Sequence, residues 1–139
     1  MDSAVNTRRT QVQLASGLNL VVGIWLIISA YVVYAHGSMT TNNVICGIAI
    51  AVLAAIRAFG AYDQSWLSWV NAAIGVWVVV SPWAVAGATG PAGPTHAMIV
   101  NNCITGGVAI VLGIWSALAT DTTPERRAYR NPPNTTYGR

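Results

Sequence analysis

Two matched stretches decide the fold of this chain: SGLNLVVGIWLIIS at residues 16–29 and SWVNAAIGVWVVVS at residues 68–81. They share Ser, Asn, Gly, Trp and Ser at the same spacing, 52 positions apart. A second pair, 39–53 and 98–112, shares Met, Asn-Asn, Ile, Gly and Val-Leu at an offset of 59 positions. Repetition at a fixed offset is the signature of a duplicated structural unit. The chain therefore contains one two-segment unit twice, and the larger second offset places seven extra residues in the loop of the second copy.

The composition places both units in a membrane. Of the 139 residues, 54% are hydrophobic and only 8% are charged, whereas a soluble domain carries roughly 25% charged residues. Hydrophobic runs of about 20 residues are long enough to cross a bilayer. We expect four such helices, over residues 14–34, 43–59, 67–86 and 101–119. So few charges also exclude a nucleic-acid-binding protein.

The basic residues predict how the chain crosses the membrane. All seven lie before the first span, at the link between spans two and three, or after span four: Arg8, Arg9, Arg57, Arg126, Arg127, Arg130 and Arg139. The positive-inside rule then places both termini in the cytoplasm. Each copy has two spans, so the copies share one orientation and are related by an axis along the membrane normal. We expect an all-α membrane protein, a pseudo-two-fold bundle of four transmembrane helices made of two tandem helical hairpins.

The predicted organisation has five parts. They are a cytoplasmic N-terminal segment (1–13), repeat 1 (14–59), a cytoplasmic link (60–66), repeat 2 (67–119) and a cytoplasmic tail (120–139). Arg57, at the end of the second span, is expected to extend its charge to the interface.

Small residues mark the faces on which the helices meet. Lipid gives little hydrophobic force between helices, so close packing depends on small side chains. The residues expected at these contacts include Asn19 and Gly23 on the first span, Asn71 and Gly75 on the third, Gly47, Ala51 and Ala55 on the second, and Ala109, Gly113 and Ala117 on the fourth. Gly106, the counterpart of Gly47, is a further structural candidate. The alternative is that these faces line a pathway. We predict that Asn19 and Asn71 form interhelical hydrogen bonds, and the alternative is that they contact an ion or a substrate. Asn43 and Asn102, each in an Asn-Asn pair, are predicted to cap the second and fourth helices, with a ligand contact as the alternative.

Trp25 and Trp77 occupy matching positions near the middle of their spans. Tryptophan usually favours the membrane interface. A midplane indole needs an acceptor for its N–H group. We predict that both pack in the core, with a lipid- or quinone-facing stacking surface as the alternative.

The tripeptide Ser81-Pro82-Trp83 lies near the outer end of the third span. Pro82 lacks an amide hydrogen, so it frees the carbonyl group of Val78 and is expected to kink the helix. Ser81 is expected to satisfy backbone groups nearby, and Trp83 is expected at the outer headgroups. Copy one has Ala30 in place of Pro82, so its helix should be straighter.

These residues resemble the SPW-repeat family of small bacterial membrane proteins. The resemblance rests on Ser81-Pro82-Trp83, on Asn71, Gly75 and Trp77 before it, and on the Asn-Asn pair before the next helix, within duplicated hairpins covering about residues 14–119. It implies a multi-pass protein of a bacterial cytoplasmic membrane, and it assigns no catalytic residue.

Groups able to do chemistry are few. His36 and His96 lie in the outer loops without neighbouring carboxylates or thiolates, so no metal site is expected, and no cofactor is expected either. Cys46 and Cys103 both lie near the outer surface. They do not occupy matching repeat positions, so we predict free thiols, with a disulfide as the alternative.

Three functions remain open at this point. The leading hypothesis is a non-catalytic membrane protein that serves as a scaffold or accessory subunit, with the bilayer, a second copy of itself or another membrane protein as its partner. The second is a small oligomeric transporter or channel in which Asn19 and Asn71 line a wet cavity. The third is a membrane redox protein that uses Cys46 and Cys103.

Overall fold

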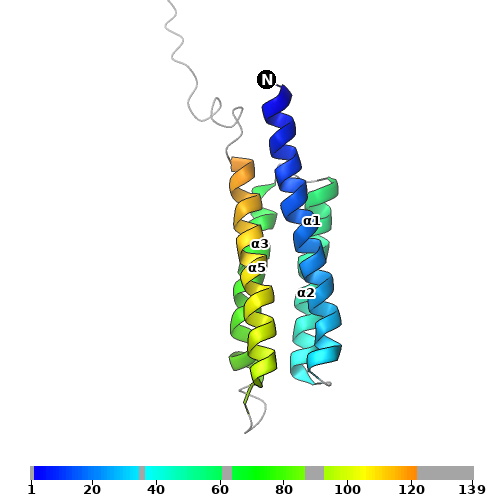
Figure 1. Ribbon diagram of the computed structural model, residues 1–139, viewed down its shortest axis with the longest axis vertical. Coiled ribbons are helices and arrows are strands. Elements are labelled where there is room, and N and C mark those ends of the chain that lie inside the picture. The colour runs from blue at the N-terminus through cyan, green and yellow to red at the C-terminus, as the bar shows by residue number, and fades with distance from the viewer. Residues whose placement is uncertain (1, 35–36, 61–63, 87–92, 122–139) are drawn as a thin grey trace, which may run out of the picture.

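The structure is a computed structural model, and it describes residues 2–34, 37–60, 64–86 and 93–121. It contains four long helices: α1 (Asp2–Val33), α2 (Ser38–Phe59), α3 (Ser65–Ser81) and α5 (His96–Asp121). A short π-helix, η1 (Pro82–Ala86), follows α3 directly. The helices stand side by side along the long axis of the molecule (Figure 1).

Four segments are long and apolar enough to cross a membrane: Arg9–Val33, Ser38–Phe59, Ser65–Ala86 and His96–Thr120. This confirms the predicted all-α membrane bundle. Several helices extend beyond the hydrophobic runs into polar sequence, as α1 does from residue 14 back to Asp2. The Gly/Pro-rich segment 87–92 and the tail 122–139 lie outside the described residues.

The chain folds as two antiparallel hairpins, α1 with α2 and α3 with α5. The hairpins then meet through α1 against α5 and α2 against α3. The start of α1, the end of α2, the start of α3 and the end of α5 lie at the same end of the bundle, which we call the terminal end (Figure 1). The opposite end, where each hairpin turns, is called the loop end.

Glycine contacts hold each hairpin together, as the spacing of small residues predicted. A methyl group on Gly23 would lie 2.7 Å from the backbone oxygen of Gly47, and one on Gly106 would lie 2.6 Å from that of Gly75. Real side-chain carbons do not approach backbone this closely, so only glycine fits at these four positions. The two contacts are equivalent under the repeat offsets of 52 and 59.

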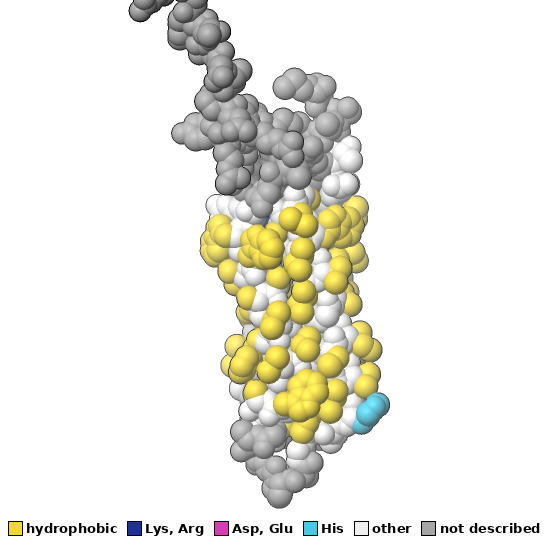
Figure 2. Space-filling view, turned by 90° about the vertical axis from the view of Figure 1, so that its left-hand side faces the viewer, with side chains coloured by type: hydrophobic (Ala, Val, Ile, Leu, Met, Phe, Trp, Pro, Cys, Tyr) yellow, Lys and Arg dark blue, Asp and Glu magenta, His cyan; other side chains and the backbone are white. Residues whose placement is uncertain are grey.

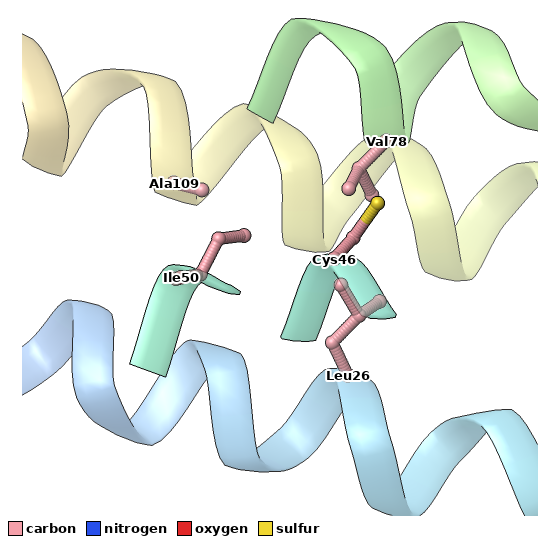
Figure 3. Close-up of a cluster of buried hydrophobic side chains, with 5 residues drawn as sticks. All are labelled: Leu26, Cys46, Ile50, Val78 and Ala109. Carbon is pink, nitrogen blue, oxygen red and sulfur yellow. The ribbon is translucent and has the colours of Figure 1, made fainter. Parts of the chain in front are cut away.

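An apolar cluster fills the middle of the bundle, with residues from all four helices. It consists of Leu26, Cys46, Ile50, Val78 and Ala109 (Figure 3). Leu26 matches Val78 between the copies, and Ile50 matches Ala109. Because residues matched by the repeat belong to one cluster, the cluster lies on the predicted pseudo-two-fold axis.

The glycine contacts predict opposite effects for two neighbouring glycines. Gly106→Ala should destabilise the protein by about 1–3 kcal/mol, because its new methyl group meets backbone that cannot move aside. Gly107→Ala meets nothing within 4 Å, so it should leave stability unchanged or raise it by up to about 1 kcal/mol through helix propensity. Unfolding by denaturing detergent measures both, and equal effects of the two variants would contradict the close contact.

Candidate functional site

A pair of asparagine side chains bridges the two hairpins near the loop end. The Nδ2 group of Asn43 donates to Oδ1 of Asn102 at 2.9 Å, and Nδ2 of Asn102 donates back to Oδ1 of Asn43 at 3.3 Å. Both residues are fully buried, and they match each other at the 59-residue offset. The predicted capping role is therefore wrong. α2 begins at Ser38 and α5 at His96, so the asparagines lie inside the helices with their side chains directed across the bundle.

Asn102 also explains the Ser-Pro-Trp motif. Pro82 cannot donate to the carbonyl oxygen of Val78. That oxygen instead accepts from the hydroxyl of Ser81 at 2.9 Å and from Nδ2 of Asn102 at 3.2 Å. The predicted role of Ser81 is confirmed, and the helix changes from α to π at Pro82. Copy one has a regular α-helix through the matching Ala30. The motif thus fixes α3 to α5 through a carbonyl group that only proline sets free.

Trp25 and Trp77 form a second symmetric pair of contacts. The indole N–H of Trp25 donates to Oδ1 of Asn101 at 3.3 Å, and that of Trp77 donates to Oδ1 of Asn42 at 2.9 Å. Each bond joins one hairpin to the other. The predicted core position is wrong, because the two side chains are 55% and 46% exposed. The indole rings face outward, where lipid supplies apolar contacts, while their N–H groups reach inward to the asparagines.

Arg57 lies buried at the terminal end, with 1% of its surface exposed. Its Nε donates to Oγ of Ser116 at 2.8 Å and its Nη2 to the carbonyl oxygen of Ser116 at 2.9 Å. It also donates to the hydroxyl of Thr120 and to the carbonyl oxygen of Gln64. The predicted extension to the interface is wrong, because these four acceptors satisfy the guanidinium inside the protein. Arg57 and Ser116 are repeat counterparts, so one arginine serves both copies at the axis.

Asn19 and Asn71 are buried at matching positions, each 2% exposed. Their Oδ1 atoms have no hydrogen-bond partner, and neither has the hydroxyl oxygen of Thr40. The predicted interhelical hydrogen bonds are therefore not made by these amide oxygens.

The outer surface of the bundle exposes many large hydrophobic side chains, and Figure 2 shows one face on which they spread between the two ends. All six tryptophans contribute to it, each about half exposed: Trp25, Trp66, Trp69, Trp77, Trp83 and Trp115. A groove of about 540 Å³ lies between α1 and α5 near the loop end, with Trp25, His96 and Asn101 in its lining. Most of this lining is apolar, as suits a surface in contact with hydrocarbon.

The cysteines are free thiols, as predicted. Cys46 is part of the central apolar cluster, and Cys103 is partly buried on α5. His96 begins α5, and His36 lies outside the described residues. Within the described ranges, no three His, Cys, Asp or Glu side chains gather where a metal ion could bind.

Several of these contacts were missed by sequence reasoning, although a signal was present. The 59-residue offset links Asn43 to Asn102 and Arg57 to Ser116, and residues related by a two-fold axis meet when they lie on it. The offset therefore indicates on-axis pairs as well as the fold. Tyr34, which donates to Asn102 and accepts from Asn101 at 2.8 Å, gave no repeat signal.

The fold and its polar contacts define a multi-pass membrane protein made of two helical hairpins that are joined by buried amides and an arginine. A model of the SPW repeat domain matches residues 13–116. The chain belongs to this family, as the resemblance indicated. No curated protein and no solved structure matches the chain.

Exchanging Arg57 and Ser116 tests the on-axis contact. Arg57→Ser should cost about 1.5–3 kcal/mol, the value of a hydrogen bond to a charged group. Ser116→Arg should cost more, because two buried positive charges would then face each other. The double exchange should recover part of the loss and not all of it, since the counterpart of Thr120 in copy one is Ala61. Detergent unfolding curves measure the cycle, and additive losses in the double variant would contradict a direct contact.

Proposed function

We propose that this protein is a non-catalytic accessory subunit that associates laterally with a second copy or with another membrane protein. The observation that carries the proposal is that polar side chains are paired inside the bundle while apolar side chains cover its surface. The polar groups that could bind a ligand are paired inside the bundle, Asn43 with Asn102 and Arg57 with Ser116. The surface offers apolar contact instead.

The tryptophans make that surface suitable for association. Tryptophan is enriched among the residues that carry the binding energy of protein interfaces. Trp66, Trp69 and Trp115 lie towards the terminal end, where an aromatic belt accounts for their position. Trp25 and Trp77 lie further inside, where a belt does not account for them. Cys46 is buried, and this position does not favour the redox alternative. The on-axis amides are buried too, and they do not favour it either.

We further propose that the protein lies in the bacterial cytoplasmic membrane with its terminal end in the cytoplasm. The support is the arginine distribution, since all seven precede, follow or link the hairpins at that end. In a variant without native cysteines, an impermeant thiol reagent added outside should reach Ala97→Cys and leave Thr10→Cys unlabelled.

Self-association is tested with two differently tagged copies produced in one cell and extracted in a mild detergent. The two tags should co-purify, and Trp25→Ala combined with Trp77→Ala should reduce recovery several-fold, because these half-exposed side chains lie where an aromatic belt does not account for them. Leu118→Ala, also about half exposed on α5, is the matched control for loss of apolar surface.

The proposal fails if neither the second tag nor any stoichiometric membrane partner is recovered and the protein sediments as a monomer. A tryptophan variant that associates as well as the Leu118→Ala control would show that the tryptophans are not the contact surface.

A further inference from the structure

The proposed function leaves the amide oxygens of Asn19 and Asn71 unexplained. Each belongs to a residue that is 2% exposed, and each lacks a hydrogen-bond partner. A buried carbonyl oxygen left unpaired costs the free energy of removing it from water. Asn43 and Asn102 avoid that cost by bonding to each other. Asn19 and Asn71 therefore occupy matching buried positions in the two copies, and the amide oxygen of each has no protein partner.

Asn19 and Asn71 lie at the same level along the bundle axis. Asn19 lies seven residues before Leu26, and Asn71 lies seven residues before Val78. Seven residues are about two helical turns, which returns a side chain to the same face of its helix. Leu26 and Val78 meet in the apolar cluster (Figure 3), so Asn19 and Asn71 face the axis two turns nearer the terminal end.

Small residues face them from the other two helices. Gly23 contacts Ala51, and Gly75 contacts Ile110. These contacts set the level of each antiparallel pair. One turn closer to the terminal end, α2 has the buried Ala54 and α5 has Gly113. The level that holds the unpaired oxygens therefore has two small residues at matching positions, and a methyl group on Gly113 would lie 2.9 Å from the backbone oxygen of Ser68.

The core on the two sides of this level differs in polarity. Towards the terminal end come the buried hydroxyl residues Ser16 and Ser68, then Arg57 with Ser116. Ser68 donates to Ser116 at 3.0 Å, and Ser116 accepts from Arg57, so these three residues form a connected polar group. Towards the loop end the apolar cluster closes the axis.

We infer that Asn19 and Asn71 form an internal water site, reached from the terminal end and closed on the other side by Leu26, Ile50, Val78 and Ala109. Two carbonyl oxygens require a ligand that donates hydrogen bonds or carries positive charge. The buried guanidinium of Arg57, one turn away from Ala54 along α2, opposes a second positive charge. Water donates two hydrogen bonds and carries no charge, and buried water in proteins typically has two to four polar partners.

Water-edited solid-state NMR on the full-length protein in lipid vesicles tests the site. Magnetisation that starts on water protons should reach the side chains of Asn19 and Asn71 and should not reach Leu26 or Val78 at the same mixing time. Asn71→Leu should reduce the transfer to Asn19 at least two-fold, because the two residues share the water. Asn42→Leu, which alters an asparagine at the other end of the bundle, should leave that transfer unchanged.

Three results would overturn the inference. The first is transfer to Asn19 and Asn71 no greater than to Leu26, with Thr120 receiving its signal. The second is equal transfer to the asparagines and to Val78, which would show that the apolar cluster does not stop water. The third is a shift of the two asparagine signals on replacing potassium chloride by sodium chloride, which would indicate a cation site. None of these measurements depends on lateral association, so the proposed function stands or falls separately.

Discussion

A polar side chain inside a bilayer has no solvent to satisfy it, and the reciprocal amide pair of Asn43 and Asn102 is how this bundle meets that constraint. Each amide is both donor and acceptor, so two copies placed across a two-fold axis satisfy each other. Asn102 adds bonds to Tyr34, to Ser81 and to the carbonyl oxygen of Val78. In hydrocarbon the alternative to such bonds is an unpaired polar group. Polar contacts therefore make the pairing of the two hairpins specific, and the glycines allow the helices within each hairpin to pack closely.

The departures from symmetry are as informative as the symmetry. Pro82 replaces Ala30, and this frees a carbonyl oxygen that Asn102 binds. The matching Asn43 exchanges hydrogen bonds with Asn102 across the axis and accepts another from its neighbour Asn42. Arg57 replaces Ser116, and two arginines at that level would repel each other. Each departure occurs at or beside the axis, where two identical residues would either clash or leave a group unpaired. We interpret them as the reason that hairpin one pairs with hairpin two.

The architecture could be predicted from the sequence because it depends on repetition and on hydrophobic length. The offset between Asn19 and Asn71, together with the low charge, predicted four spans in two equivalent hairpins, and the glycine contacts followed from Gly23 and Gly75. Side-chain directions were less predictable. Asn43 was expected at a helix end because its hydrophobic run starts there, yet tertiary packing extends α2 back to Ser38.

Arg57 and the tryptophans show the same limit. A charge at the end of a hydrophobic run usually turns outward, but Ser116 and Thr120 on α5 offered acceptors that no local pattern on α2 reveals. Trp25 faces outward because Asn101, 76 residues later in the sequence, accepts a hydrogen bond from its indole N–H group at the edge of the bundle. Both outcomes depend on which residues of distant helices lie at the same level. The two repeat offsets predict these neighbours once they are taken to define a two-fold axis.

The central claim is that the buried residues Asn43 and Asn102, matched by the 59-residue offset, meet across a pseudo-two-fold axis within one chain. Cysteines placed at Asn43 and Asn102, in a chain lacking Cys46 and Cys103, test it in native membranes with dibromobimane, which fluoresces when it joins two neighbouring thiols. The account predicts an intramolecular product on a monomeric band, with little product for the pair Asn43→Cys and Ile104→Cys, because Ile104 is 63% exposed on the outer face. A product only between two chains, or equal yields for both pairs, would contradict it.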